Sequence, residues 1–239
     1  MDKQRITERL RENEIPFSQE LPEKLECYFR LLMSWNEKMD LVAEAPEEEL
    51  LNRHWLDSLT ALKTGLTDGV ERLIDVGTGA GFPGMALALA LPSLRVTLLD
   101  SQQKRLRFLE DVAQKTGAEN VTLVHARAED GARNPDLRER FDAAAARAVA
   151  PLNVLCEYLL PFVKIGGKAL CWKGPAIRDE MESGRRAAHL LGGKVLEPVY
   201  TPLAGLTWDH LILPVAKISR TPGTYPRKAG TPGGQPLGV

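Results

Sequence analysis

Four glycines and one acid with the spacing of a ligand-binding turn lie together in Asp75-Val-Gly-Thr-Gly-Ala-Gly-Phe-Pro-Gly84. Glycine adopts positive φ at little steric cost, so Gly77, Gly79 and Gly81 can form a tight turn whose backbone N–H groups face a ligand. Asp100 follows the apolar run 95–99 and could accept hydrogen bonds from two ribose hydroxyls. This combination of residues predicts a site for a nucleotide-like cofactor.

Two cofactors fit the glycine pattern. Gly79, Gly81 and Gly84 match G-x-G-x-x-G, the fingerprint that favours NAD. The register argues against NAD, because the first glycine after the apolar run is Gly77, and the preceding Asp75 makes the segment resemble motif I of class I S-adenosylmethionine (SAM) methyltransferases. SAM has cationic groups that an acid suits, and it has no pyrophosphate. We therefore favour SAM over NAD, with a ligand-free glycine turn as the remaining alternative.

The elements around this turn follow from the hydrophobic pattern, which predicts alternating strands and helices. We expect helices over 85–91, 101–117, 151–163 and 175–191. We expect strands over 73–76, 95–99, 121–125, 141–146, 168–172, 194–200 and 206–215. Ser101 is the expected N-cap of its helix, and Gly117 is the expected stop. The order predicts an α/β, Rossmann-like fold with a seven-stranded, mostly parallel sheet.

Two amphipathic helices are expected before the turn, over 21–42 and 47–62, because apolar residues recur there every three or four positions. We expect a helical cap over 1–68, a SAM-binding domain over 69–218 and a basic Pro/Gly-rich tail over 219–239. Asn36, His54 and Asp57 are candidate functional residues of the cap. For the histidine, a hydrogen-bonded structural role is the alternative.

Composition narrows the class of protein. The 239 residues are 44% hydrophobic and carry a net charge of −1, which suits one sizeable core and does not by itself suggest nucleic acid. Residues 1–60 hold eight Lys/Arg against fourteen Asp/Glu, whereas 210–239 hold four basic residues and no acid. This tail could contact a polyanion, or it could be disordered and solvated.

Cysteine usage and the absence of long apolar runs point to the cytoplasm. Cys27, Cys156 and Cys171 are an odd number without C-x-x-C spacing, which argues against a disulfide framework or a zinc site and favours buried free thiols. The start of the chain lacks the apolar segment of a signal peptide, and no run is long enough to span a membrane. We expect a cytoplasmic protein without a metal or a membrane.

The carboxyl ends of parallel strands meet at one edge of a sheet, which would bring Asp100, Glu129 and Arg147 beside the glycine turn. The sequence lacks the Asn/Asp-Pro-Pro-Tyr/Phe and Pro-Cys motifs of amino-group and C5-cytosine methylation. Guanine N7 has a ready lone pair and needs no base, and arginine reads the O6/N7 edge of guanine. Arg147 is therefore the candidate on the acceptor side. An ion pair with Asp75 or Asp142 is the alternative.

Motifs along the whole chain resemble the RsmG (GidB) family of bacterial methyltransferases. They are Trp35-Asn36 with Leu41, His54 with Asp57-Ser58-Leu59, the 75–84 segment, Asp100-Ser101 with Lys104-Arg105, Arg127-Ala-Glu129, Phe141-Asp142, Arg147-Ala-Val-Ala150, Lys173-Gly174, Tyr225-Pro226-Arg227 and Gly230-Thr-Pro232. One departure is Asp40, an acid where the family has a neutral amide, which puts an RNA contact there in question. The tail match favours an ordered tail.

The resemblance implies a SAM-dependent enzyme that methylates N7 of a guanosine in the 530 loop of 16S ribosomal RNA. The expected SAM contacts are Gly77, Gly79, Phe82, Asp100, Ser101, Gln102, Ala128, Glu129 and Arg147, which is also the expected catalytic residue. The expected RNA contacts are His54, Lys104, Arg105, Lys173, Arg227 and Lys228, with Arg185 and Arg186 as further phosphate contacts. The expected partner is 16S ribosomal RNA or the small ribosomal subunit, bound by a monomer. The alternatives are a small-molecule SAM methyltransferase and a non-catalytic SAM- or RNA-binding module.

Overall fold

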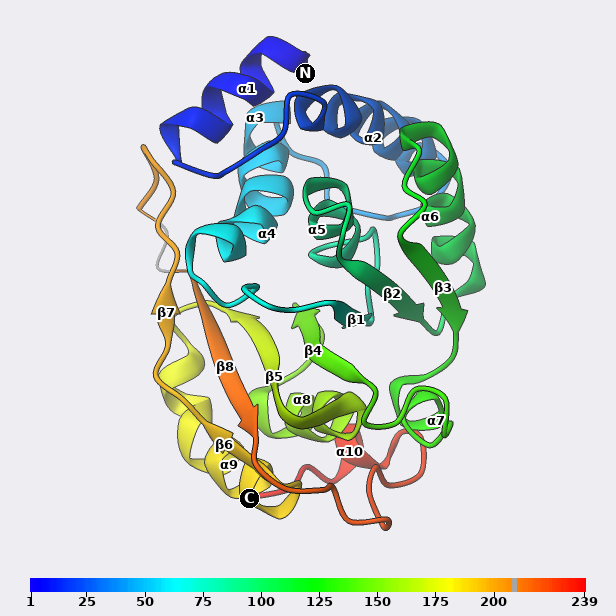
Figure 1. Cartoon of the computed structure of the whole chain (residues 1–239), viewed down its shortest axis with the longest axis vertical. Helices are drawn as coiled ribbons and strands as arrows, with labels where there is room; N and C mark the ends of the chain where they lie inside the picture. Colours follow the sequence, from blue (N-terminus) through cyan, green and yellow to red (C-terminus); the bar gives the residue numbers. More distant parts are fainter. Residues whose placement is uncertain (208–209) are drawn as a thin grey trace.

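The computed structural model describes residues 1–207 and 210–239 and shows a central sheet with helices on both faces (Figure 1). Its strands are β1 (Arg72–Val76), β2 (Arg95–Asp100), β3 (Val121–His125), β4 (Phe141–Arg147), β5 (Val163–Lys173), β6 (Gly193–Val195), β7 (Val199–Tyr200) and β8 (Leu211–Lys217). They pair in the order β3-β2-β1-β4-β5-β8-β6, and β7 also pairs with β8. β1 to β5 run parallel, whereas β8 is antiparallel to its neighbours. The predicted α/β class is thus confirmed.

The helices complete the layers above and below the sheet. They are α1 (Lys3–Glu12), α2 (Leu21–Asn36), α3 (Glu47–Leu50), α4 (Asp57–Leu59), α5 (Gly84–Ala90), α6 (Gln103–Thr116), α7 (Ala128–Gly131), α8 (Leu152–Leu159), α9 (Ile177–Leu190) and α10 (Thr231–Gly234). A π-helical segment (Leu51–Leu56) joins α3 to α4, and short 3-10 turns cover Thr60–Lys63 and Leu160–Phe162.

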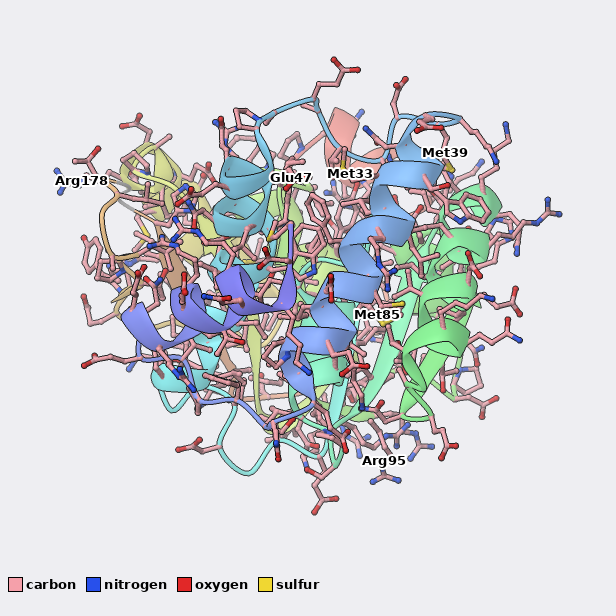
Figure 2. All side chains as sticks on the ribbon, turned by 90° about the horizontal axis from the view of Figure 1, so that it is seen from above. Met33, Met39, Glu47, Met85, Arg95 and Arg178 are labelled. Carbon is pink, nitrogen blue, oxygen red and sulfur yellow. The ribbon has the colours of Figure 1, made fainter. Side chains whose placement is uncertain are left out.

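The side chains of β1 alternate between two hydrophobic clusters, which explains the two layers. Leu73 packs in one cluster with residues of α2, α5 and α6, whereas Ile74 and Val76 pack in the other with residues of α8 and α9. Seen from above, Met85 of α5 lies inside the molecule, while Arg95 and Arg178 project outward (Figure 2). The cap shares the first cluster with the sheet, since that cluster runs from Ile6 to Ile212.

Several predicted boundaries differ from the structure. The helix expected over 21–42 ends at Asn36, because the Asn36 side-chain oxygen accepts hydrogen bonds from the backbone N–H groups of Leu41 (2.8 Å) and Val42 (3.0 Å). The strand expected over 194–200 is divided into β6 and β7. The strand expected over 206–215 begins at Leu211, and residues 208–209 of that prediction lie outside the described part of the chain.

Cysteine and tail predictions can also be checked. All three thiols are free, and Cys156 and Cys171 are buried, but Cys27 is only partly covered. The possibility of a disordered, solvated tail is wrong. Arg138 donates to the carbonyls of Thr221 and Tyr225 (both 2.9 Å), and Asn153 donates to the carbonyl of Leu237 (2.9 Å), so the tail is fastened along its length.

Candidate active site

The glycine turn between β1 and α5 is formed as predicted. Gly77, Gly79 and Gly81 have φ values of 73°, 59° and 96°, a region that favours glycine. Asp75 supports the turn from inside: its Oδ2 accepts hydrogen bonds from Thr78 Oγ1 (2.7 Å) and from the backbone N–H of Gly84 (2.8 Å). Asp75 is fully buried, and it does not line the adjacent cavity. The expectation that this acid faces the cationic groups of a cofactor is therefore wrong.

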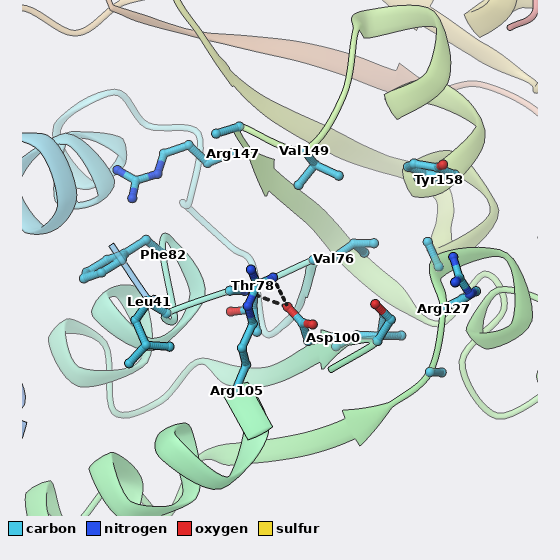
Figure 3. A pocket seen from close by; sticks show the side chains of 18 of the residues that line it. Leu41, Val76, Thr78, Phe82, Asp100, Arg105, Arg127, Arg147, Val149 and Tyr158 are labelled. Atoms are coloured by element: carbon cyan, nitrogen blue, oxygen red, sulfur yellow. Dashed lines mark hydrogen bonds and ion pairs between the residues drawn. The ribbon is translucent and has the colours of Figure 1, made fainter. Parts of the chain in front are cut away.

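A first cavity, of about 470 Å³, opens beside the turn (Figure 3). Its lining includes residues from the turn, from the ends of β2 and β4, from α7 and from the tail. They are Leu41, Val42, His54, Val76 to Ala80, Phe82, Leu99 to Ser101, Arg105, Ala126 to Glu129, Arg147 to Val149, Tyr158 and Gly230. The predicted strand ends thus meet around one space of a size that suits a nucleoside-type ligand.

Asp100, at the end of β2, is tied to both neighbouring segments. Its Oδ2 accepts from the backbone N–H of Gly79 (2.9 Å), and its Oδ1 accepts from the backbone N–H of Gln102 (2.8 Å). Arg105 lies 3.5 Å from the same carboxylate, so it faces the cavity and not only the solvent. The second bond keeps the chain extended through Gln102, which is why Gln102, and not Ser101, is the N-cap of α6.

A second cavity, of about 490 Å³, lies on the other side of Arg147. Its lining comes from the π-helical segment, α4, the ends of β4 and β5 with the residues that follow them, and the residue just before β8. These residues are Arg53, His54, Asp57, Arg147, Ala148, Ala150, Trp172, Lys173, Gly174 and His210. His54, Arg147 and Ala148 line both cavities, so they form the wall between them. Ala148 holds φ of 56°, an uncommon conformation for a residue with a side chain.

The side chain of Arg147 is held by the π-helical segment and by the first residue of α4. Its Nη1 donates to the carbonyl of Arg53 (2.5 Å) and to Oδ2 of Asp57 (3.1 Å), while Nη2 lies 2.9 Å from Nδ1 of His54. The alternative of an ion pair is thus observed, but the partner is Asp57 and not Asp75 or Asp142. His210 bonds the other carboxylate oxygen of Asp57 at 3.0 Å.

Aromatic packing fixes the same wall. The His54 ring stacks on Phe82 with centroids 5.1 Å apart, and the Arg147 guanidinium lies 5.2 Å from the same phenyl ring. Burial and the neighbouring Arg147 cation lower the pKa of His54 to about 4. At neutral pH the imidazole is therefore uncharged, and the nearby fixed charges are those of Arg147 and Asp57.

Some of the remaining predicted residues line a cavity and others do not. Lys173 lines the second cavity, where it bonds the carbonyl of Ala150 (2.9 Å) and Glu180 (2.6 Å). Lys104, Lys228 and Gln102 are exposed and line neither cavity. Arg227 also lines neither, because its guanidinium pairs with the buried Glu157.

Sequence reasoning did not select several lining residues: Arg127, Tyr158, Trp172, His210 and Gly230. Arg127 and Gly230 stand inside the segments that carried the family resemblance, so the signal for them was present. Trp172 and His210 come from strand ends whose neighbours in space are set only by the fold.

Comparison with known proteins identifies the family. The GidB model, described as rRNA small subunit methyltransferase G, matches residues 21–201. Two proteins named ribosomal RNA small subunit methyltransferase G are similar over nearly the whole length: one from Alkaliphilus metalliredigens is 46% identical, covering 90% of each chain, and one from Alkaliphilus oremlandii is 47% identical, covering 88% of each. The chain belongs to the rRNA small subunit methyltransferase G family.

Solved structures agree with this on fold. A 16S rRNA (adenine(1408)-N(1))-methyltransferase from Catenulisporales acidiphilia has a TM-score of 0.52 at 19% identity, covering 74% of this chain and 94% of that one. A variant of MtNAS in complex with S-adenosylmethionine has a TM-score of 0.54 at 16% identity, covering 82% and 75%. At such identities the likeness concerns the fold alone.

Membership in the rRNA small subunit methyltransferase G family makes the chain a SAM-dependent methyltransferase of ribosomal RNA, which confirms the predicted enzyme class and cofactor. NAD is thereby ruled out as the cofactor. Within residues 1–207 and 210–239, no helix combines the length and apolar character that crossing a bilayer requires.

Proposed function

We propose that the first cavity, called the cofactor cavity from here on, holds SAM and that the second cavity receives a guanosine of 16S ribosomal RNA, with methyl transfer across the wall between them. The observation that carries this proposal is the wall itself. His54, Arg147 and Ala148 face both spaces, so a donor on one side and an acceptor on the other can approach each other there. In-line transfer at carbon depends mainly on such alignment.

The proposed cofactor contacts follow the lining of the first cavity. The backbone from Gly77 to Phe82 would surround the methionine part of SAM. Asp100 would accept hydrogen bonds from the ribose hydroxyls, and Glu129 would accept one from the adenine amino group. Ser101 and Ala128 would complete the walls beside the nucleoside. Asp100 already accepts two backbone hydrogen bonds, so its carboxylate is oriented before the ligand arrives.

The acceptor side of the wall suits guanine N7, the acceptor atom of this family. N7 must keep its lone pair for the methyl, so Arg147 is proposed to hold O6 of the base while the indole of Trp172 borders the pocket. The positive charge of the sulfonium moves onto the base during transfer. Asp57 offsets the charge of Arg147, and His54 is neutral, so the second cavity does not strongly oppose that charge.

Cations around the two openings are proposed to hold the RNA backbone. Arg105 and Arg127 line the cofactor cavity, and Lys173 lines the second. Phosphate contacts by Lys104 and Lys228 remain predictions that rest on exposure and charge. We further propose that the protein is a monomer and that it acts in the cytoplasm. The three free thiols support the second point, because free thiols suit a reducing compartment.

The test is methyl transfer to ribosomal RNA from a strain that lacks this protein. Purified chain and labelled SAM are added to the 16S RNA or the small subunit, and digested nucleosides are analysed by mass. The proposal expects one N7-methylguanosine, mapped by chain cleavage to the 530 loop. Label on another base, or turnover of a free metabolite without any RNA product, would refute it.

A further inference from the structure

The C-terminal tail reaches the cofactor cavity although it is remote in sequence from the glycine turn. Gly230 lines the cavity, and its backbone N–H donates to Oε1 of Glu129 over 2.8 Å. Glu129 is 4% exposed, so this carboxylate has little access to solvent. Tyr158 and Arg127, which is two residues before Glu129, lie on the side of the cavity away from Phe82 (Figure 3).

An ion pair with a buried carboxylate fastens the tail just before Gly230. Arg227 donates from Nη2 to Oε2 of Glu157 (2.6 Å), from Nε to Oε1 (3.0 Å) and from its backbone N–H to Oε1 (2.7 Å). Glu157 lies on α8 and has no exposed surface. Two-point contact fixes the direction of the guanidinium as well as its position. The Glu157–Arg227 latch therefore fixes the chain three residues from Gly230.

Gly230 has the geometry that this role requires. Its φ is 84°, so a residue with a side chain would be strained there, and its N–H points at the carboxylate. Within the described residues, Glu129 accepts this hydrogen bond at Oε1. The tail thus occupies one oxygen and orients the carboxylate, which leaves Oε2 available to a ligand amine.

We propose that the tail is part of the cofactor site: Gly230 orients Glu129 to read the exocyclic amine of the adenine, and the Glu157–Arg227 latch holds Gly230 in place. This inference rests on the proposed function, because it takes the adenine to lie at the Glu129 end of the cavity. Arg227 and Gly230 are positioning residues, since they act through the carboxylate and not on the reacting methyl. On this proposal, the tail segment from Tyr225 to Pro232 helps to bind the cofactor and is not limited to contact with RNA.

The test measures discrimination between an amine and a carbonyl at the purine. Dissociation constants are determined by calorimetry for S-adenosylhomocysteine and for its deaminated analogue, S-inosylhomocysteine. The full chain should prefer the adenine form by about tenfold to a hundredfold, since the analogue leaves the carboxylate without its donor. A purely structural tail would leave this ratio unchanged even if overall affinity fell.

The latch is removed with the double variant Glu157→Gln/Arg227→Met, which leaves no buried charge unpaired. We expect S-adenosylhomocysteine to bind about tenfold or more weakly and the preference for adenine to fall toward one, while KM for the RNA stays the same. The matched control is a chain ending at Pro236, which keeps the latch and Gly230 and should retain both values. Circular dichroism verifies that each variant is folded.

A second variant keeps the inference testable if the double variant does not fold. Glu129→Gln keeps an acceptor for the Gly230 N–H and should lose the adenine preference by itself. An unchanged ratio in Glu129→Gln, or in a folded latch variant, would overturn the inference. Failure of the full chain to bind S-adenosylhomocysteine would instead overturn the proposed function.

Discussion

Arg147 donates a hydrogen bond from Nη2 to Nδ1 of His54 over 2.9 Å, because a guanidinium has donors only and the imidazole nitrogen must accept. Nδ1 therefore carries no proton, and any proton on the neutral ring is on Nε2. The lowered pKa of His54, about 4, agrees with this assignment. In the wall between the two cavities, the charge of Arg147 is thus paired with Asp57, and the neighbouring His54 ring is uncharged.

Replacing Arg147 should affect both activity and stability. Arg147→Ala should lower kcat/KM for the RNA by a hundredfold or more, and it should also destabilise the fold by about 3 kcal/mol, because Asp57 is 2% exposed and loses its cationic partner. Methyl transfer and urea denaturation measure the two effects.

The double variant Arg147→Ala/Asp57→Asn separates these effects. Without the carboxylate charge, most of the lost stability should return, whereas the activity should not. If the double variant regained activity together with stability, Arg147 would be a structural residue only.

Acidification should destabilise the protein through His54. Its folded pKa, about 4, is below the ordinary 6.5, so the unfolded chain binds more protons between these values. The contribution of His54 is thus present above pH 6.5 and is lost as pH falls through this window, by on the order of 3 kcal/mol. His54→Asn, whose amide oxygen can replace Nδ1, should lose less stability than the parent between pH 7.5 and pH 5. Equal losses in urea denaturation would contradict the assignment.

Asp75 should have the opposite pH dependence. Burial raises the pKa of this carboxyl to about 6, so the folded chain binds the proton more tightly than the unfolded one. The contribution of Asp75 is therefore largest below its ordinary pKa of 3.8 and is lost as pH rises through 6.

Asp75→Asn tests this, since the amide oxygen can accept from Thr78 and Gly84 as Oδ2 does. We expect the variant to gain stability relative to the parent as pH rises from 4 to 7. A large loss of stability at neutral pH, measured by thermal unfolding, would show instead that the turn requires the charge.

Two glycines of the turn should respond differently to an added methyl group. A Cβ on Gly79 would meet only the carbonyl of Gly77, at 3.9 Å, so Gly79→Ala should fold with a cost of about 1 kcal/mol for its positive φ. Since Gly79 lines the cofactor cavity, the methyl should weaken SAM binding by about tenfold.

Gly84→Ala is the matched comparison. Its Cβ would lie 2.5 Å from Leu98 Cδ2 and 2.6 Å from Asp75 Cβ, so this variant should lose about 1–3 kcal/mol of folding stability. Calorimetric titration with SAM and thermal unfolding measure both variants. Greater thermal damage at Gly79 than at Gly84 would be inconsistent with the assigned turn.

Local sequence patterns identified the strand ends well, because parallel strands must expose their carboxyl ends at one edge. The turn, Asp100, Glu129 and Arg147 were brought together for this reason. Partners set by distant packing could not be inferred. Nothing near Glu157, in the middle of an apolar helix, indicates that it binds Arg227, and nothing around Asp57 specifies Arg147 or His210 as its partner.

The hydroxyl of Tyr28, on α2 of the cap, donates to the carbonyl of Ala80 within the glycine turn, and Gly81 packs directly against the same hydroxyl. Tyr28 itself lines neither cavity. A residue that lines neither cavity can therefore set the shape of the turn that we propose to bind the cofactor. A substitution at the contact between Tyr28 and the turn should raise KM for SAM. Exchanging helices α1 and α2 between relatives should therefore change the affinity for SAM.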